Sequence, residues 1–271
     1  MSASGEPQAA GILRLERVTM QFGGLKAVAD LDLAIPQGEL YGLIGPNGAG
    51  KTTVFNLITG VYAPTEGAIQ FEGRSIRGLR PSAIARRGIT RTFQNIRLFG
   101  SRTCCDNVCI AAHQHTEAGL IDAVLRTGRY ARDERAMQDR AHELLELTGL
   151  GLWAETIAAE LPYGQQRRLE IARALAGKPR LLLLDEPAAG LNPQESDDLM
   201  HLIESLRQRF GLTVLLIEHD MRVVMGICRR IAVLDYGVKI AEGTPAEIRT
   251  DRRVIEAYLG EEVPADLGAG S

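Results

Sequence analysis

Residues 45–52 read Gly-Pro-Asn-Gly-Ala-Gly-Lys-Thr and fit the pattern G-x-x-x-x-G-K-[ST] at every fixed position. An apolar run at 40–44 precedes them, and a segment with apolar residues at helical spacing follows at 54–58. In this context the pattern predicts a loop whose backbone N–H groups surround the phosphates of a bound nucleotide at the start of a helix. We expect these residues to bind phosphate: Asn47, Gly48, Ala49, Gly50, Lys51, Thr52 and Thr53.

A phosphate-binding loop of this kind needs a carboxylate at the end of a neighbouring strand. Residues 181–186, Leu-Leu-Leu-Leu-Asp-Glu, supply two. We expect Asp185 and the Thr52 hydroxyl to hold Mg²⁺. Because consecutive residues at a strand end face differently, Glu186 is predicted to act on the attacking water as a general base or orienting group.

Two further polar residues stand at the ends of apparent strands, Gln94 in Thr-Phe-Gln-Asn and His219 after the run 214–218. In doubly wound folds the carboxyl ends of parallel strands converge on the ligand crevice. Gln94 is therefore available to the metal and the water, and His219 to the γ-phosphate.

The rest of the chain predicts an α/β fold with one parallel sheet. The runs 40–44, 181–184 and 214–217 are almost continuously apolar, as in parallel strands covered on both faces. Alternating patterns predict half-exposed antiparallel strands, an edge strand over 13–20 and a second over 31–35. Further expectations are a helix ending at Gly211, a helical subdomain at about 100–160, a capped helix after Thr244, and a short helix ended by Gly260.

Composition limits the class of protein. A net charge of −3 does not indicate a nucleic-acid-binding surface, and no apolar run approaches the ~20 residues of a membrane span. We therefore expect a cytoplasmic chain that a partner brings to any membrane. Cys104, Cys105 and Cys109, with His113 and His115, could be metal ligands, but buried apolar roles are expected for the cysteines.

Five motifs in order resemble the ATP-binding subunit of ABC transporters over residues 12–260: the loop at 45–52, Gln94, Leu-Pro-Tyr-Gly-Gln at 161–165, Leu-Leu-Leu-Leu-Asp-Glu at 181–186, and His219. The resemblance implies one cassette domain, with tails at 1–11 and 261–271 expected to be disordered. It implies that Phe22, with Val28 nearby, contacts adenine, and that Mg²⁺ accompanies ATP. It also implies a head-to-tail dimer in which Tyr163, Gly164 and Gln165 contact the ATP of the opposite subunit.

Two departures from the general family pattern alter this expectation. Pro162 and Tyr163 replace the serine and first glycine of the usual LSGGQ, so a hydroxyl contact with phosphate, about 1.5 to 3 kcal/mol, is lost while the helix start remains. Asn192 stands in the dimer-contact loop where aspartate is usual. A working but altered site is expected.

The sequences of four segments are similar to those of the branched-chain amino acid importer ATPases. These segments are residues 93–99, 161–175, 185–193 and 254–262. That resemblance implies a second cassette, identical or different, two membrane permeases, a solute-binding protein, and a place at the cytoplasmic face of the inner membrane. A coupling helix of the permease would contact Ile96, Leu98 and Phe99. From the sequence alone, a place in the hydrophobic core is an equal alternative for these side chains. Importers of urea or amides, and a soluble ATPase of iron–sulfur assembly, remain alternatives. Chromosome-type ATPases need a long insert, and only 134 positions separate Lys51 from Asp185.

Overall fold

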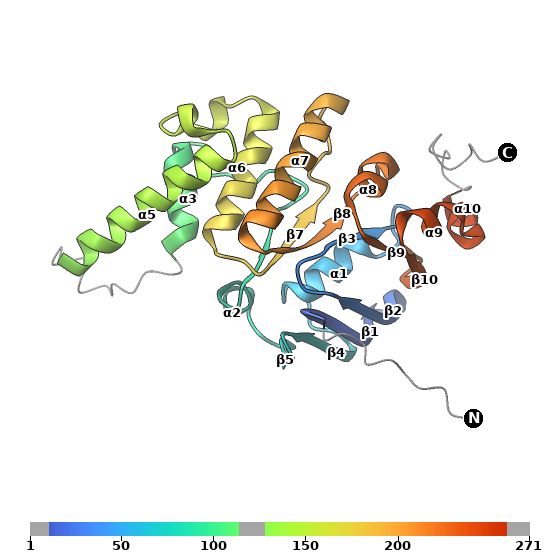
Figure 1. Cartoon of the computed structure of the whole chain (residues 1–271). Coiled ribbons are helices and arrows are strands. Elements are labelled where there is room, and N and C mark those ends of the chain that lie inside the picture. The colour runs from blue at the N-terminus through green and yellow to red at the C-terminus, as the bar shows by residue number, and fades with distance from the viewer. Residues whose placement is uncertain (1–10, 114–127, 259–271) are drawn as a thin grey trace.

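The computed structural model describes residues 11–113 and 128–258, which form two β-sheets and helices that pack between and beside them (Figure 1). Of the predicted tails, 1–11 and 261–271, only Gly11 is among the described residues. The strands are β1 (Leu13–Phe22), β2 (Leu25–Ile35), β3 (Leu40–Ile44), β4 (Glu66–Phe71), β5 (Arg74–Ser75), β6 (Ile89–Arg91), β7 (Leu181–Asp185), β8 (Thr213–Ile217), β9 (Arg230–Asp235) and β10 (Val238–Gly243). The helices of the α/β part are α1 (Lys51–Ile58), α2 (Pro81–Arg86), α6 (Tyr163–Ala176), α7 (Pro193–Phe210), α8 (Met221–Ile227), α9 (Pro245–Thr250) and α10 (Arg252–Tyr258).

The larger sheet has the strand order β10-β9-β3-β8-β7-β6 and is parallel except for β10, which pairs antiparallel with β9. Every residue of β3, β7 and β8 is buried, because helices or the second sheet cover both faces. The prediction of parallel strands from continuous apolar runs is therefore confirmed. Since β3 lies beside β8, and β8 beside β7, the segments that follow the carboxyl ends of these three strands lie at one edge of the sheet.

The smaller sheet is antiparallel with the order β2-β1-β4-β5. The prediction of an edge strand over 13–20 is wrong, because β1 pairs with β2 on one side and with β4 on the other. Alternation of apolar and polar residues reports which face of a strand is buried, whereas edge position depends on hydrogen-bonding partners from elsewhere in the chain. Helix α1 lies between the two sheets, and its Val54 and Phe55 belong to the same hydrophobic cluster as Leu15 and Leu43 (Figure 1).

Between residues 100 and 160 the described elements are helical. They are α3 (Cys104–Ala112), α5 (Gly128–Leu147) and two 3₁₀ turns, Gly151–Trp153 and Ala158–Glu160, with a single bridge between Thr103 and Ile157. Leu144 and Leu145 of α5 share one hydrophobic cluster with Leu169 of α6 and Leu182 of β7. This helical part thus packs directly on the parallel sheet's helices rather than around a core of its own.

The predicted helix ends that lie within the described residues are present in the structure. Gly211, with φ 61°, ends α7, and Asn192 begins it with a capping box to Glu195. Thr244 and Glu247 form the predicted capping box of α9. The predicted end of the last helix at Gly260 lies outside the described residues. None of the described helices combines the length and apolarity needed to cross a membrane.

Candidate nucleotide-binding site

The loop at 45–52 joins β3 to α1, and its glycines fit their surroundings closely. Gly45 has φ 148°, and a Cβ there would collide with the carbonyl oxygen of Leu234 in β9. Gly50 has φ 100°, and a Cβ there would lie 2.5 Å from the carbonyl oxygen of Ala27. Only glycine satisfies both the backbone conformation and the space at these two positions. The loop is therefore held between β2 and the end of β9.

A cavity of about 380 Å³ opens above this loop. Residues 47–53 form its floor, and Gln94 and Glu186 border it from the ends of the neighbouring strands. The Lys51 side chain is buried, and its Nζ donates hydrogen bonds to the carbonyl oxygens of Gly45, at 2.7 Å, and Pro46, at 2.9 Å. A buried ammonium, the start of α1 and a first helical turn free of acidic residues make this cavity suited to a polyphosphate.

The two adjacent carboxylates contact different partners, as predicted from their position at a strand end. Asp185 is buried and accepts a 2.6 Å hydrogen bond from Nη2 of Arg91. Burial raises the pKa of Asp185, and the hydrogen bond and charge of Arg91 oppose that rise. Glu186 instead accepts a 3.0 Å hydrogen bond from Nε2 of Gln94, and its Oε2 lies 3.7 Å from Nδ1 of His219. Glu186 therefore contacts both of the other residues predicted at the strand ends, Gln94 and His219.

Glu186 also has an unusual backbone conformation. Its φ is 47°, in the left-handed region that residues with a side chain rarely adopt, and its N–H donates to the carbonyl oxygen of Ile217 at 2.9 Å. Such backbone conformations cost on the order of 1 to 3 kcal/mol and are typical of functional sites. The strain turns the side chain of Glu186 from the direction of Asp185 toward Gln94 and His219.

Sequence reasoning missed two charged residues that lie beside these carboxylates. Arg91 donates to Asn56 as well as to Asp185, and its guanidinium lies over the rings of Phe55 and Phe93. The signal was present, since an aspartate directly after four leucines requires a buried partner.

Glu218 is the second such residue. It is 1% exposed, and it accepts hydrogen bonds from the N–H groups of Ala188, at 2.9 Å, and His219, at 3.3 Å. Burial raises the pKa of Glu218. Its position directly before His219 offered no comparable signal in the sequence.

The residues predicted to contact adenine lie apart from the cavity wall. Phe22 is half-exposed and packs edge-on against Tyr62, with ring centroids 5.1 Å apart. The prediction for Val28 needs correction: it is fully buried in the hydrophobic core between the sheets, and Leu25, Lys26 and Ala27 line the cavity instead. Tyr236, in the turn between β9 and β10, also lines the cavity and was not predicted.

Tyr163, Gly164 and Gln165 are not among the described residues that line this cavity. They begin α6, and the Tyr163 hydroxyl donates to the carbonyl oxygen of Ala189 at 3.1 Å. Arg167 of the same helix donates to the Tyr163 hydroxyl at 2.8 Å and to the carbonyl oxygen of Gln94 at 2.7 Å. The start of α6 is thereby fixed to the Gln94 segment and to the segment after Glu186.

Four features together define an ATP-binding cassette. They are a phosphate-binding loop after one strand of the parallel sheet, an Asp-Glu pair at the end of another strand of that sheet, glutamine and histidine beside that glutamate, and an antiparallel sheet packed on α1. The comparisons with known proteins agree with this class. The ABC transporter family model matches residues 28–189, and a model described as branched-chain amino acid ATP-binding cassette transporter matches residues 238–264.

Two relatives carry the description "high-affinity branched-chain amino acid transport ATP-binding protein". BraF of Pseudomonas aeruginosa is 49% identical over 250 residues, and LivG of Escherichia coli K12 is 48% identical over 250 residues. Each alignment covers 92% of this chain and 98% of the relative. A crystal structure of a nucleotide-free ATP-binding cassette from an ABC transporter superposes with a TM-score of 0.81 at 32% identity, covering 92% of this chain and 99% of that one. The chain belongs to the ABC transporter family and is one of its ATP-binding, ATP-hydrolysing subunits.

Proposed function

We propose that this protein powers a multi-subunit importer of branched-chain amino acids by hydrolysing ATP. The observation that carries the ATPase assignment is the contact of Glu186 with both Gln94 and His219 beside the cavity above residues 45–52. The substrate class is supported by the relatives BraF and LivG, which match over nearly their whole length, and by the match at residues 238–264. Neither the soluble assembly ATPase nor the urea or amide importer is favoured by these comparisons.

In this proposal the loop N–H groups and Lys51 bind the phosphates. Thr52, Gln94 and Asp185 hold Mg²⁺, which prefers such oxygen ligands and would neutralise charge on the phosphates. The Arg91 guanidinium favours the ionised form of the buried Asp185 and orients it. Glu186 positions and deprotonates the attacking water, and Gln94 and His219 hold its carboxylate at the cavity border.

The adenine would lie beside Phe22. Phe22 is half-exposed, and its partner in the β1–β2 pairing, Leu25, lines the cavity. A half-exposed aromatic ring provides an apolar face for a flat base. Val28 is fully buried and packs near Gly50 of the phosphate-binding loop.

A second cassette, identical or different, completes the site by placing its residues 163–165 against the phosphates. The first turn of α6 contains no acidic residue, so its positive end is available to an anion. Tyr163 does not block that end, since its hydroxyl is bonded to Ala189 and Arg167 of its own chain. Replacement of glycine by tyrosine in this motif is therefore compatible with a functional site.

Membrane permeases would contact the surface formed by α2, β6 and α6. There Val61 and Phe99 are about half exposed, and a cavity of about 300 Å³ lies among Pro81, Ile84, Phe93 and Arg173. Of the predicted coupling residues, Ile96 and Leu98 are half-buried, so Phe99 offers the most surface. Two permeases would hold the chain at the cytoplasmic face of the inner membrane, and a solute-binding protein would deliver the amino acid.

The test uses a strain that lacks this subunit and is complemented with the full-length chain. Uptake of leucine, isoleucine and valine should be restored by the wild type and by Lys178→Ala, an exposed lysine outside the site, but not by Lys51→Ala. Branched-chain uptake that is independent of Lys51 would contradict the transport function. Restored uptake of urea or amides instead of branched-chain amino acids would contradict the substrate class.

A further inference from the structure

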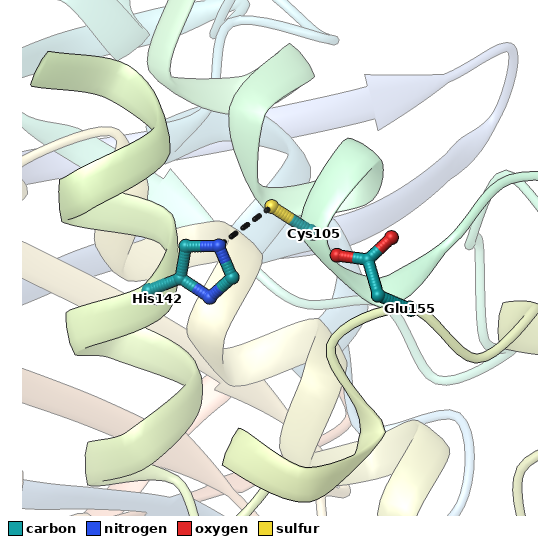
Figure 2. A group of neighbouring side chains, drawn as sticks. All are labelled: Cys105, His142 and Glu155. Atoms are coloured by element: carbon teal, nitrogen blue, oxygen red, sulfur yellow. Dashed lines mark hydrogen bonds between the residues drawn. The ribbon is translucent and has the colours of Figure 1, made fainter. Parts of the chain in front are cut away.

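Three potential metal ligands meet on the helical part of the chain, outside the residues that line the nucleotide cavity. They are Cys105 of α3, His142 of α5 and Glu155, which follows the 3₁₀ turn Gly151–Trp153. Their ligand atoms all lie within 4.8 Å of one another, and Cys105 Sγ is 4.0 Å from His142 Nε2 (Figure 2). Side chains from three separate elements thus point toward one another.

We propose that Cys105, His142 and Glu155 bind one Zn²⁺ ion. A thiolate, an imidazole and a carboxylate are the three ligand types that zinc prefers in proteins, and this set does not suit Mg²⁺ or Ca²⁺. A site with three protein ligands keeps its fourth tetrahedral position for water, which suits a cluster at the surface.

Between the thiol and the imidazole, the geometry requires only a small adjustment. Tetrahedral zinc with a Zn–S bond of about 2.3 Å and a Zn–N bond of about 2.0 to 2.1 Å places sulfur and nitrogen about 3.6 Å apart. The observed separation of 4.0 Å is about 0.4 Å longer. His142 and Glu155 are exposed while Cys105 is half-buried, so the two exposed side chains can move toward a fixed thiolate.

The surroundings favour a cation. The carboxylates of Asp106 and Glu134 lie near the thiols of Cys105 and Cys109 and add negative charge to this surface. Cys109, one helical turn after Cys105, has its Sγ 4.0 Å from that of Cys105 but also 3.9 Å from the carbonyl oxygen of Met137. We assign Cys109 a place against α5, outside the ligand set.

Zinc at this position would join α3, α5 and the segment at 151–155. Binding would release the thiol proton of Cys105 and stabilise the folded chain, because the unfolded chain does not hold the three ligands together. This inference does not depend on the transported substrate or on ATP hydrolysis.

The experiment uses the untagged full-length chain, treated with a chelator and kept reduced by a phosphine, and Zn²⁺ alone is titrated by calorimetry. The wild type should bind one Zn²⁺ per chain, and Cys105→Ser, His142→Ala and Glu155→Gln should each weaken binding about tenfold or more. His201→Ala, an exposed histidine on α7, is the matched control and should bind as the wild type does. All three ligand positions are at least partly exposed, so folding should survive, which thermal unfolding without metal checks.

Co²⁺ provides a direct probe of the sulfur ligand. The wild type loaded with Co²⁺ should show thiolate-to-cobalt absorption in the near ultraviolet, and Cys105→Ser should lack it. Zn²⁺ should also raise the unfolding temperature of the wild type more than that of Cys105→Ser. The absence of stoichiometric binding, or binding that persists equally in Cys105→Ser and His142→Ala, would overturn the proposal and leave only a weak thiol–imidazole hydrogen bond.

Discussion

Replacement of Arg167 by methionine should be among the most destabilising single changes in this protein. The guanidinium is buried and donates hydrogen bonds to the carbonyl oxygens of Phe93, at 3.1 Å, and Gln94, at 2.7 Å, and to the hydroxyl of Tyr163, at 2.8 Å. It also lies 3.4 Å from the carboxylate of Glu170, whose side chain is 1% exposed. One cation therefore satisfies four groups at the junction of α6 and the Gln94 segment.

The magnitude follows from what remains after the cation is removed. Each hydrogen bond from a charged donor contributes about 1.5 to 3 kcal/mol, but the three share one donor group and are not additive. Breaking a buried ion pair by removing one partner costs about 3 to 5 kcal/mol, because the other charge stays buried. We expect a loss of about 4 kcal/mol, which lowers the unfolding temperature by on the order of 10 °C.

The pH dependence gives this prediction a definite sign. Burial raises the pKa of Glu170 above its usual value even beside Arg167, and loss of the cation should raise it further. Stability linked to a raised carboxyl pKa is present below the unfolded-state pKa and is lost as the pH rises through the folded-state pKa. The deficit of Arg167→Met should therefore be smaller at pH 5 than at pH 8, and Arg167→Met/Glu170→Gln should recover part of it.

Urea unfolding followed by circular dichroism measures these free energies. Arg168→Met is the matched control, since Arg168 is only half-buried and makes a single 3.3 Å hydrogen bond to the carbonyl oxygen of Thr148. A loss for Arg167→Met no larger than that of the control, or no recovery on adding Glu170→Gln, would refute the reasoning. In the assembled complex, ATP hydrolysis should fall more than ATP binding, because the Gln94 segment loses its attachment to α6.

Three further changes test separate parts of the molecule. Glu186→Gln should lower ATP hydrolysis in the assembled complex by about 10² to 10⁴-fold while ATP binding changes little, and unchanged turnover would exclude its role as base. Glu218→Gln should gain stability relative to the wild type as the pH is raised from 5 to 8, since burial raises the pKa of Glu218 and glutamine does not titrate. A pH-independent difference in urea unfolding would contradict this. Asn192→Ala should cost about 1 kcal/mol through loss of the α7 cap, whereas Asn192→Asp should keep it, and equal losses would show that capping is not the cause.

The phosphate loop and the buried strands could be predicted because local sequence determines them. Residues 45–52 specify a backbone path through glycine positions, and β3, β7 and β8 are apolar at nearly every position because both faces are covered. The interior position of β1 could not be predicted, since its partner β4 lies about fifty residues further along the chain. Sequence alternation carries no information on such pairing.

The same limit applies to side chains that bridge distant segments. Arg91 and Asp185 are 94 positions apart, and Arg167 reaches Gln94 across 73. For the cysteines, neighbours in sequence suggested a different set from the one that the fold brings together. Cys105 meets His142 and Glu155 from other elements, whereas His113 ends α3 and His115 lies outside the described residues. Spacing within one segment cannot indicate ligands that the fold brings from three.

The two unusual motifs, Leu-Pro-Tyr-Gly-Gln and Ala-Ala-Gly-Leu-Asn, are connected in the structure. The Tyr163 ring lies so close to Gly190, which has φ 80°, that a Cβ there would be 3.1 Å from Tyr163 Cε1. The tyrosine hydroxyl donates to Ala189 and accepts from Arg167, which also holds Gln94. A tyrosine at position 163 therefore favours glycine at 190 and gives Arg167 one of its partners. Because Gln94 contacts Glu186, this one unit joins the surface proposed to meet a second cassette to the carboxylate proposed to act on water.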